Sequence, residues 1–230
     1  MSDSRPNPDD LLASVQRTEA KARRGRLKIF FGMCPGVGKT FAMLEEARRR
    51  QAEGVEVIAG IVETHGRKDT AALLEGMPIV PRAKIEYRGA TLDEMDLDGI
   101  LAWHPPLVLV DELAHTNAPG SRHTKRYQDV LELLNAGIDV FTTLNVQHLE
   151  SRAEVVAQIS GVPVRETLPD SILDHADEIA LIDLSPEQLR ERLADGKVYL
   201  GERAATAAAN FFKESNLTAL REMSLRITAE

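Results

Sequence analysis

A glycine-rich stretch at residues 32–40 constrains the fold of this chain more than any other sequence feature. It reads Gly-Met-Cys-Pro-Gly-Val-Gly-Lys-Thr. It lies between the apolar segment 27–31 and the segment 41–47, in which the apolar residues have helical spacing. A buried strand, a glycine-rich turn and a helix N-terminus together form a binding site for phosphate groups. The stretch therefore predicts a nucleotide-binding strand–turn–helix unit.

The expected contacts with ATP follow from the residue types in this stretch. Glycines let backbone N–H groups approach phosphate oxygens, the Lys39 ammonium is expected to reach the β- and γ-phosphates, and the Thr40 hydroxyl is expected to bind Mg²⁺. The residues predicted to contact the nucleotide here are Gly36, Val37, Gly38, Lys39, Thr40 and Phe41. The stretch departs from the strict Walker A pattern, because Met33 stands where the first glycine belongs and Gly32 lies one residue too early. A chance glycine-rich turn between a strand and a helix is the alternative.

A second motif follows about 70 residues later, where the apolar run 107–110 ends in Asp111 and Glu112. This pattern is typical of a Walker B strand, whose terminal carboxylate lies near the phosphates. Asp111 is predicted to hold Mg²⁺ together with Thr40. Glu112 is the candidate catalytic residue, which would orient or deprotonate an attacking water or hydroxyl group. An exposed loop carboxylate is the alternative for Glu112.

Further polar residues come directly after predicted strands. Ligands of open α/β sheets bind beyond the carboxyl ends of the strands. Asn145 and Gln147, after the predicted strand 138–143, are therefore predicted to contact the γ-phosphate. His65 and Arg67, after the strand 55–62, are further candidates for the same cleft. Additional candidates, for which a surface position is the alternative, follow the second motif: His115, Thr116, Asn117, Arg122, Lys125 and Arg126.

The alternation of strands and helices along the chain predicts an α/β fold of the P-loop NTPase type, with a mainly parallel sheet and helices on both faces. Residues 1–25 are predicted to form an N-terminal extension with a helix over 11–24. Residues 26–184 are the predicted nucleotide-binding core. Residues 185–230 are predicted to form a mostly helical C-terminal appendage.

Local signals predict some element boundaries. Thr91 and Glu94 have the spacing of a capping box, which predicts a helix running to about Trp103. Ser185 followed by Pro186 predicts another helix start. Residues 146–159 are expected to form one helix, whereas 161–176 show no clear pattern.

Composition excludes several classes of function. The net charge of −8 argues against a general nucleic-acid-binding protein, including a motor acting on nucleic acid. No apolar run approaches the roughly 20 residues that span a bilayer, so the chain is expected to be soluble. The single cysteine, Cys34, is interpreted as structural, with a redox switch as the alternative. The six histidines lack zinc-binding spacing, which leaves Mg²⁺ bound with a nucleotide as the predicted metal.

Segments spread over nearly the whole chain resemble one known family. They lie at residues 8–12, 24–40, 110–122, 142–151, 210–213 and 216–222, and they include the displaced first glycine of the glycine-rich stretch. In these segments the chain resembles the N-terminal cytoplasmic domain of the KdpD family, the potassium-responsive sensor histidine kinases of bacteria.

This resemblance implies a function that the motifs alone do not give. It implies an ATP-binding regulatory domain of a two-component sensor kinase that controls potassium-uptake genes. A catalytic phosphotransferase or ATPase, similar to a protein serine kinase and using the same site, is the alternative. The resemblance also implies a cytoplasmic domain of an inner-membrane protein. Its implied partners are the other domains of that protein, and a response regulator or a potassium-pump subunit. The histidine kinase core itself is not expected within these residues.

Overall fold

The structure is a computed structural model of the chain, and it describes residues 24–196, 198 and 211–229. Its centre is a five-stranded sheet with the strand order β2-β5-β6-β1-β7, and every pair of neighbouring strands is parallel. This confirms the predicted α/β fold with a mainly parallel sheet. The strands are β1 (Leu27–Gly32), β2 (Val57–Ile61), β5 (Leu107–Val110), β6 (Asp139–Asn145) and β7 (Glu178–Leu181).

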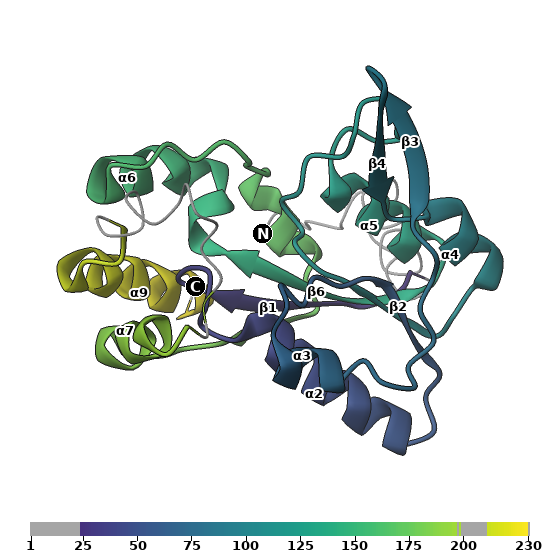
Figure 1. Cartoon of the computed structure of the whole chain (residues 1–230), viewed down its shortest axis with the longest axis horizontal. Coiled ribbons are helices and arrows are strands. Elements are labelled where there is room, and N and C mark those ends of the chain that lie inside the picture. The colour runs from purple at the N-terminus through teal and green to yellow at the C-terminus, as the bar shows by residue number, and fades with distance from the viewer. Residues whose placement is uncertain (1–23, 197, 199–210, 230) are drawn as a thin grey trace, which may run out of the picture.

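Alternate residues of the strands enter two separate hydrophobic clusters, one on each face of the sheet. Phe30 of β1 packs edge to face against Phe141 of β6, with the ring centroids 5.7 Å apart. Helix α2 (Lys39–Ala52) covers this face, and α3 (Lys68–Ala72) lies beside α2 (Figure 1). The neighbouring residues Ile29 and Phe31 point into the other cluster.

Several helices cover the second face. They are α4 (Leu97–Trp103), α5 (Arg126–Asn135), α6 (Glu150–Ser160), α7 (Pro186–Ala194) and α9 (Glu214–Ala229). Leu189 of α7 and Leu217 and Leu220 of α9 are fully buried in the same cluster as Ile29. The C-terminal helices therefore pack directly on the sheet (Figure 1). The predicted helix over 11–24 lies almost entirely outside the described residues, and the predicted domain boundaries stay predictions.

The predicted helix from Thr91 to Trp103 is wrong over its first half. Residues 83–94 form an antiparallel hairpin of β3 (Ala83–Tyr87) and β4 (Ala90–Glu94). Arg88 and Gly89 connect the strands with φ values of 50° and 80°. Two successive positive φ values are what a tight two-residue hairpin turn requires. The turn thus overrides the capping-box pattern.

Helix α4 starts only at Leu97, where the Asp96 carboxylate accepts a hydrogen bond of 3.0 Å from the Gly99 N–H. The predicted start at Ser185 is confirmed, since its hydroxyl accepts from the Gln188 N–H at 3.2 Å. The single helix expected over 146–159 is divided into a 3₁₀ turn, η1 (Val146–His148), and α6. Residues 161–176, for which the sequence showed no clear pattern, contain a second 3₁₀ helix, η2 (Asp170–His175).

Candidate functional site

The glycine-rich loop (residues 32–40) connects β1 to α2 at the carboxyl edge of the sheet. Gly36 and Gly38 have φ values of 94° and 102°, which favour glycine. The displaced first glycine has a structural reason. A Cβ on Gly32 would lie 2.7 Å from the Val37 Cγ2 atom, so only glycine fits there. Met33, by contrast, is buried in the core.

Lys39 is the buried cation of this loop. Its side chain is 8% exposed, and its Nζ donates to the backbone oxygen of Cys34 at 3.0 Å. Burial lowers the pKa of Lys39 to about 8. Among the described residues no carboxylate lies within ion-pair distance of this ammonium. Lys39 is therefore a buried positive charge without a direct ion-pair partner in that part of the chain, while the carboxylates of Asp111 and Glu112 act on it from a distance.

Cys34 supports the loop rather than offering a reactive thiol. Its side chain is fully buried, and burial raises the pKa of the thiol to about 12. A thiol becomes nucleophilic only as the thiolate. The structural interpretation of Cys34 is thus favoured.

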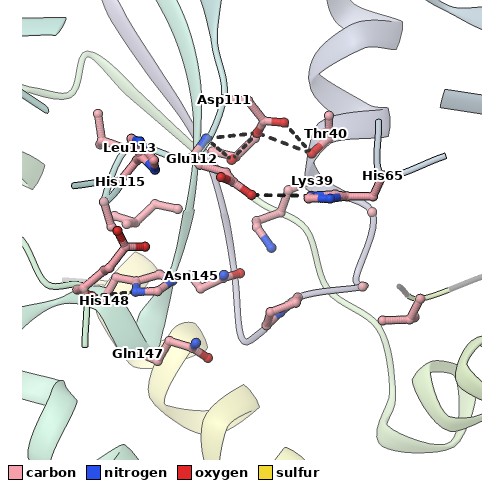
Figure 2. Close-up of a pocket in the computed structure, with 18 of the residues that line it drawn as sticks. Lys39, Thr40, His65, Asp111, Glu112, Leu113, His115, Asn145, Gln147 and His148 are labelled. Carbon is pink, nitrogen blue, oxygen red and sulfur yellow. Dashed lines mark hydrogen bonds and ion pairs between the residues drawn. The ribbon is translucent and has the colours of Figure 1, made fainter. Parts of the chain in front are cut away.

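Asp111 is buried immediately beyond β5, only 1% exposed. It accepts hydrogen bonds from the Thr143 hydroxyl at 2.6 Å and the Glu63 N–H at 3.2 Å. It also accepts from the Thr40 hydroxyl at 3.1 Å (Figure 2). Burial raises the pKa of Asp111, and the Thr143 hydrogen bond opposes that rise. The residues predicted to hold Mg²⁺, Thr40 and Asp111, are therefore in direct contact although 71 positions apart in the chain.

Glu112 points away from Asp111 toward His65 (Figure 2). Its φ of 57° lies in the left-handed region that side chains other than glycine rarely adopt. The Glu112 Oε1 is 3.4 Å from the His65 Nε2. This contact lowers the pKa of Glu112 and raises the pKa of His65. Glu112 is therefore an ionised carboxylate at neutral pH.

These groups surround a cavity of about 300 Å³. Most of the predicted site residues line it: Gly36, Gly38, Lys39, Thr40, His65, Arg67, Asp111, Glu112, His115, Asn145 and Gln147. Among the residues predicted from the glycine-rich stretch, Val37 and Phe41 do not. The Val37 side chain is buried in the core, and Phe41 lines a neighbouring cavity instead.

Asn145 and Gln147 project into this cavity from the end of β6 and from η1 (Figure 2). The Asn145 Oδ1 and Gln147 Oε1 atoms are buried, and neither has a hydrogen-bond partner among the described residues. A buried polar atom without a partner is costly, unless a ligand or water supplies one. Both amides are thus available to a ligand.

Arg126, one of the candidates after the second motif, neither lines the cavity nor lies at the surface. It is 2% exposed, and its Nη1 donates to the backbone oxygen of Asp111 at 2.9 Å. Its Nη2 is 3.5 Å from Glu94 at the end of the hairpin. His115 also contacts Glu94, at 3.1 Å. Arg126 and Glu94 therefore support the backbone that carries Asp111.

The other candidates after β5 also lie outside the cavity. The Asn117 amide donates to Asp129 at 2.7 Å, and the Lys125 ammonium donates to the Thr116 hydroxyl at 2.8 Å. Arg122 is exposed and pairs with Asp98 and with Glu132. Thr116, Arg122 and Lys125 lie at the surface, which was the alternative to a role in the site.

Glu166 and Val198 are among the cavity-lining residues that sequence reasoning missed. Glu166 comes from the stretch that had no pattern, and its carboxylate accepts from the Thr116 N–H at 2.8 Å. Val198 lies so close to the loop that a Cβ on Gly36 would be 2.6 Å from its Cγ2 atom. Neither residue carries a motif, and only the packing brings them here.

The described residues contain no group of three or more histidine, cysteine or acidic side chains that could hold a metal ion. Thr40 and Asp111 offer oxygen atoms only. Mg²⁺ is typically held by one or two carboxylates together with substrate phosphates and water. The donor set therefore fits a magnesium ion that arrives with a nucleotide.

Comparison with known proteins identifies the family. The family model described as the osmosensitive K⁺ channel His kinase sensor domain, KdpD, matches residues 23–230. The chain belongs to the KdpD sensor domain family. This confirms the resemblance drawn from the sequence motifs.

Curated KdpD proteins match almost the whole chain. The sensor protein KdpD of Escherichia coli (strain K12) is 57% identical over 226 residues, which cover 98% of this chain and 25% of that protein. The sensor protein KdpD of Mycobacterium tuberculosis (strain ATCC 25618 / H37Rv) is 54% identical over 203 residues, which cover 88% of this chain and 24% of that protein. The putative sensor protein KdpD of Synechocystis sp. is 54% identical over 207 residues, or 90% and 56%. The chain thus spans about a quarter of the length of the first two KdpD relatives. Among its described helices, none is both long and apolar enough to cross a membrane.

Proposed function

We propose that this chain is an ATP-binding regulatory domain of a KdpD-type sensor kinase that controls potassium-uptake genes. One observation carries the proposal. The Thr40 hydroxyl and the Asp111 carboxylate are 3.1 Å apart on the wall of a cavity that also contains the buried Lys39 ammonium. A cation and a hydroxyl–carboxylate pair beside a glycine-rich turn match the charge of a nucleoside triphosphate with its Mg²⁺.

Each part of the cavity has a role in this proposal. The Lys39 ammonium and the N–H groups around Gly36 and Gly38 bind the terminal phosphates. Thr40 and Asp111 hold Mg²⁺, which neutralises phosphate charge. Asn145 and Gln147 donate their amide N–H groups to the γ-phosphate, and their unpaired amide oxygens accept from water beside it.

The proposed role is regulatory because the relatives of which this chain spans about a quarter are named sensor proteins. The proposed partners are the other domains of such a protein, then a response regulator or a potassium-pump subunit. The proposed location is the cytoplasmic side of the inner membrane. A nucleic acid is not among the proposed partners, since the chain carries a net charge of −8.

Calorimetric titration of the chain with ATP and Mg²⁺ tests this proposal. Lys39→Ala removes the buried cation, and we expect it to weaken ATP binding at least 100-fold, or about 2.7 kcal/mol. Lys84→Ala is the matched control, because Lys84 lies on the exposed hairpin and pairs there with Asp93. Unchanged affinity in Lys39→Ala would contradict the assignment of the site.

A specific observation also favours a second candidate, a phosphotransferase or ATPase. Glu112 is ionised, lines the cavity and is held in a strained conformation, as catalytic residues often are. It would accept the proton of an attacking water or serine hydroxyl, while Lys39 stabilises the charge of the transferred phosphoryl group. Labelled ATP distinguishes the candidates. Product that disappears in Glu112→Gln supports the enzyme, and absence of product in the native chain supports the regulatory domain.

A further inference from the structure

A second cavity of about 680 Å³ adjoins the first. Phe41 in the first turn of α2, residues 65–70 at the start of α3 and the end of α7 line it. His65, Arg67 and Val198 line both cavities, so a single ligand can extend from one to the other. The second cavity is the larger of the two, and Phe41 adds an aromatic ring to its wall.

Two guanidinium groups, those of Arg67 and Arg192, line this second cavity. Within the described part of the chain, neither group has a carboxylate within 4 Å. Arg67 donates only to the backbone oxygen of Thr64, at 3.1 Å, and the Arg192 Nε is buried without a hydrogen-bond partner in that part. Burial lowers the pKa of Arg67, the Asp111 carboxylate opposes this, and the charge of Arg192 adds to the lowering. Asp69 also lines this cavity, but neither guanidinium forms an ion pair with it, and two like charges without such a partner favour an anion between them.

Arg192 lies directly beside the glycine-rich loop. Its Nη1 is 3.8 Å from the position that a Cβ on Gly38 would occupy, and Gly38 is the N-cap of α2. Lys39 and the Asp111–Thr40 pair lie in the first cavity, whereas Arg192 lies in the second. A phosphate that contacts Arg192 is therefore the one nearest the second cavity.

We propose that Arg192 and Arg67 bind the phosphate next to the nucleoside, and that the second cavity holds the ribose and base. This inference rests on the proposed function, and it adds a residue from the C-terminal helices to the nucleotide site. Helix α7 also contacts α9, where Arg190 is 3.4 Å from Glu214. The nucleotide thus contacts the part of the chain that follows the sheet.

Titration of the chain with Mg-ATP and with Mg-ADP, by calorimetry, tests the inference in Arg192→Gln. A charge-assisted hydrogen bond to phosphate is lost, so we expect affinity to fall about 10- to 100-fold. The fall should be equal for ATP and ADP, because both contain the phosphate next to the nucleoside. Arg192→Lys keeps a charge and should lose less. Arg190→Gln, two residues away on the same helix, is the matched control and should bind both nucleotides as the native chain does.

The possible results separate the inference from the proposed function. If the native chain binds ATP and Arg192→Gln binds it equally well, the inference is overturned and the proposed function stands. A loss confined to ATP would also overturn it, because Arg192 would then contact the terminal phosphate. A native chain that binds neither nucleotide overturns both. Melting temperatures without nucleotide show whether each variant is folded. If Arg192→Gln does not fold, Arg192→Lys decides, and undiminished affinity in that variant overturns the inference.

Discussion

The two carboxylates that follow β5 are neighbours in the chain, but their environments are opposite. Asp111 is 1% exposed and accepts several hydrogen bonds, whereas the Glu112 side chain is 46% exposed and contacts His65. Burial raises the pKa of Asp111, and the His65 contact lowers that of Glu112. Figure 2 shows the two side chains directed to different groups, Asp111 to Thr40 and Glu112 to His65.

The turn after β5 places two consecutive carboxylates in different environments, and each environment suits a different function. The φ of 57° at Glu112 reverses the chain immediately after the strand, so the second carboxylate leaves the core. A buried carboxylate among fixed donors suits a metal-holding role, and an accessible ionised one suits proton transfer. Asp111 and Glu112 should therefore differ in function as they do in environment.

The largest expected difference concerns ATP affinity in the presence of Mg²⁺. Asp111→Asn removes the charge beside the metal, and we expect affinity to fall roughly 10-fold or more, since a hydrogen bond to a charged group contributes about 1.5–3 kcal/mol. Glu112→Gln should bind within about 2-fold of the native chain. The same titrations with excess chelator should remove the difference. Equal losses of affinity in the two variants would show that Asp111 and Glu112 do not differ in function.

A smaller effect is expected on the stability of the free chain, and with opposite signs. Glu112→Gly relieves the left-handed conformation and should raise the free energy of unfolding by up to about 1 kcal/mol. Asp111→Gly leaves the Thr143 hydroxyl and neighbouring N–H groups unpaired, and should lower it by about 2 kcal/mol. Urea unfolding of both variants measures these changes. A destabilised Glu112→Gly variant would show that the conformation is not strained.

The smallest expected effect concerns the pH dependence of stability and involves His148. Burial disfavours the charged form of this residue, as it does for Asp111. Partial burial lowers the pKa of His148 below the ordinary value of 6.5, and its Nδ1 is 2.7 Å from the Glu166 backbone oxygen. The unfolded chain therefore binds a proton first as the pH falls below about 6.5, and this costs stability. Between about pH 7 and pH 5, the native chain should lose more stability than His148→Gln. Parallel pH profiles would contradict this.

Much of the site could be predicted, because its signals are local. The strand before Asp111, the glycines around Lys39 and the polar residues after β6 each lie within a short segment. The parallel sheet then brings the strand ends together. For this reason the contact between Thr40 and Asp111 was expected from sequence alone.

The features that could not be predicted from the sequence depend on contacts between distant segments of the chain. The pattern of Thr91 and Glu94 fits a helix cap, yet Glu94 is buried at a strand end, where it contacts His115 and Arg126. Nothing in the local sequence indicates those partners. Likewise Arg192 reaches the glycine-rich loop only because α7 packs on the sheet through Leu189. Such positions follow from tertiary packing, which overrides local signals.

A structure of the chain with Mg²⁺ and a non-hydrolysable ATP analogue tests the central claim most directly. We predict that the terminal phosphates lie within hydrogen-bonding distance of the Lys39 Nζ, with the metal on the Thr40 hydroxyl and the Asp111 carboxylate beside it. A nucleotide bound elsewhere, or a metal remote from Asp111, would contradict the assignment of ATP and Mg²⁺ to this cavity.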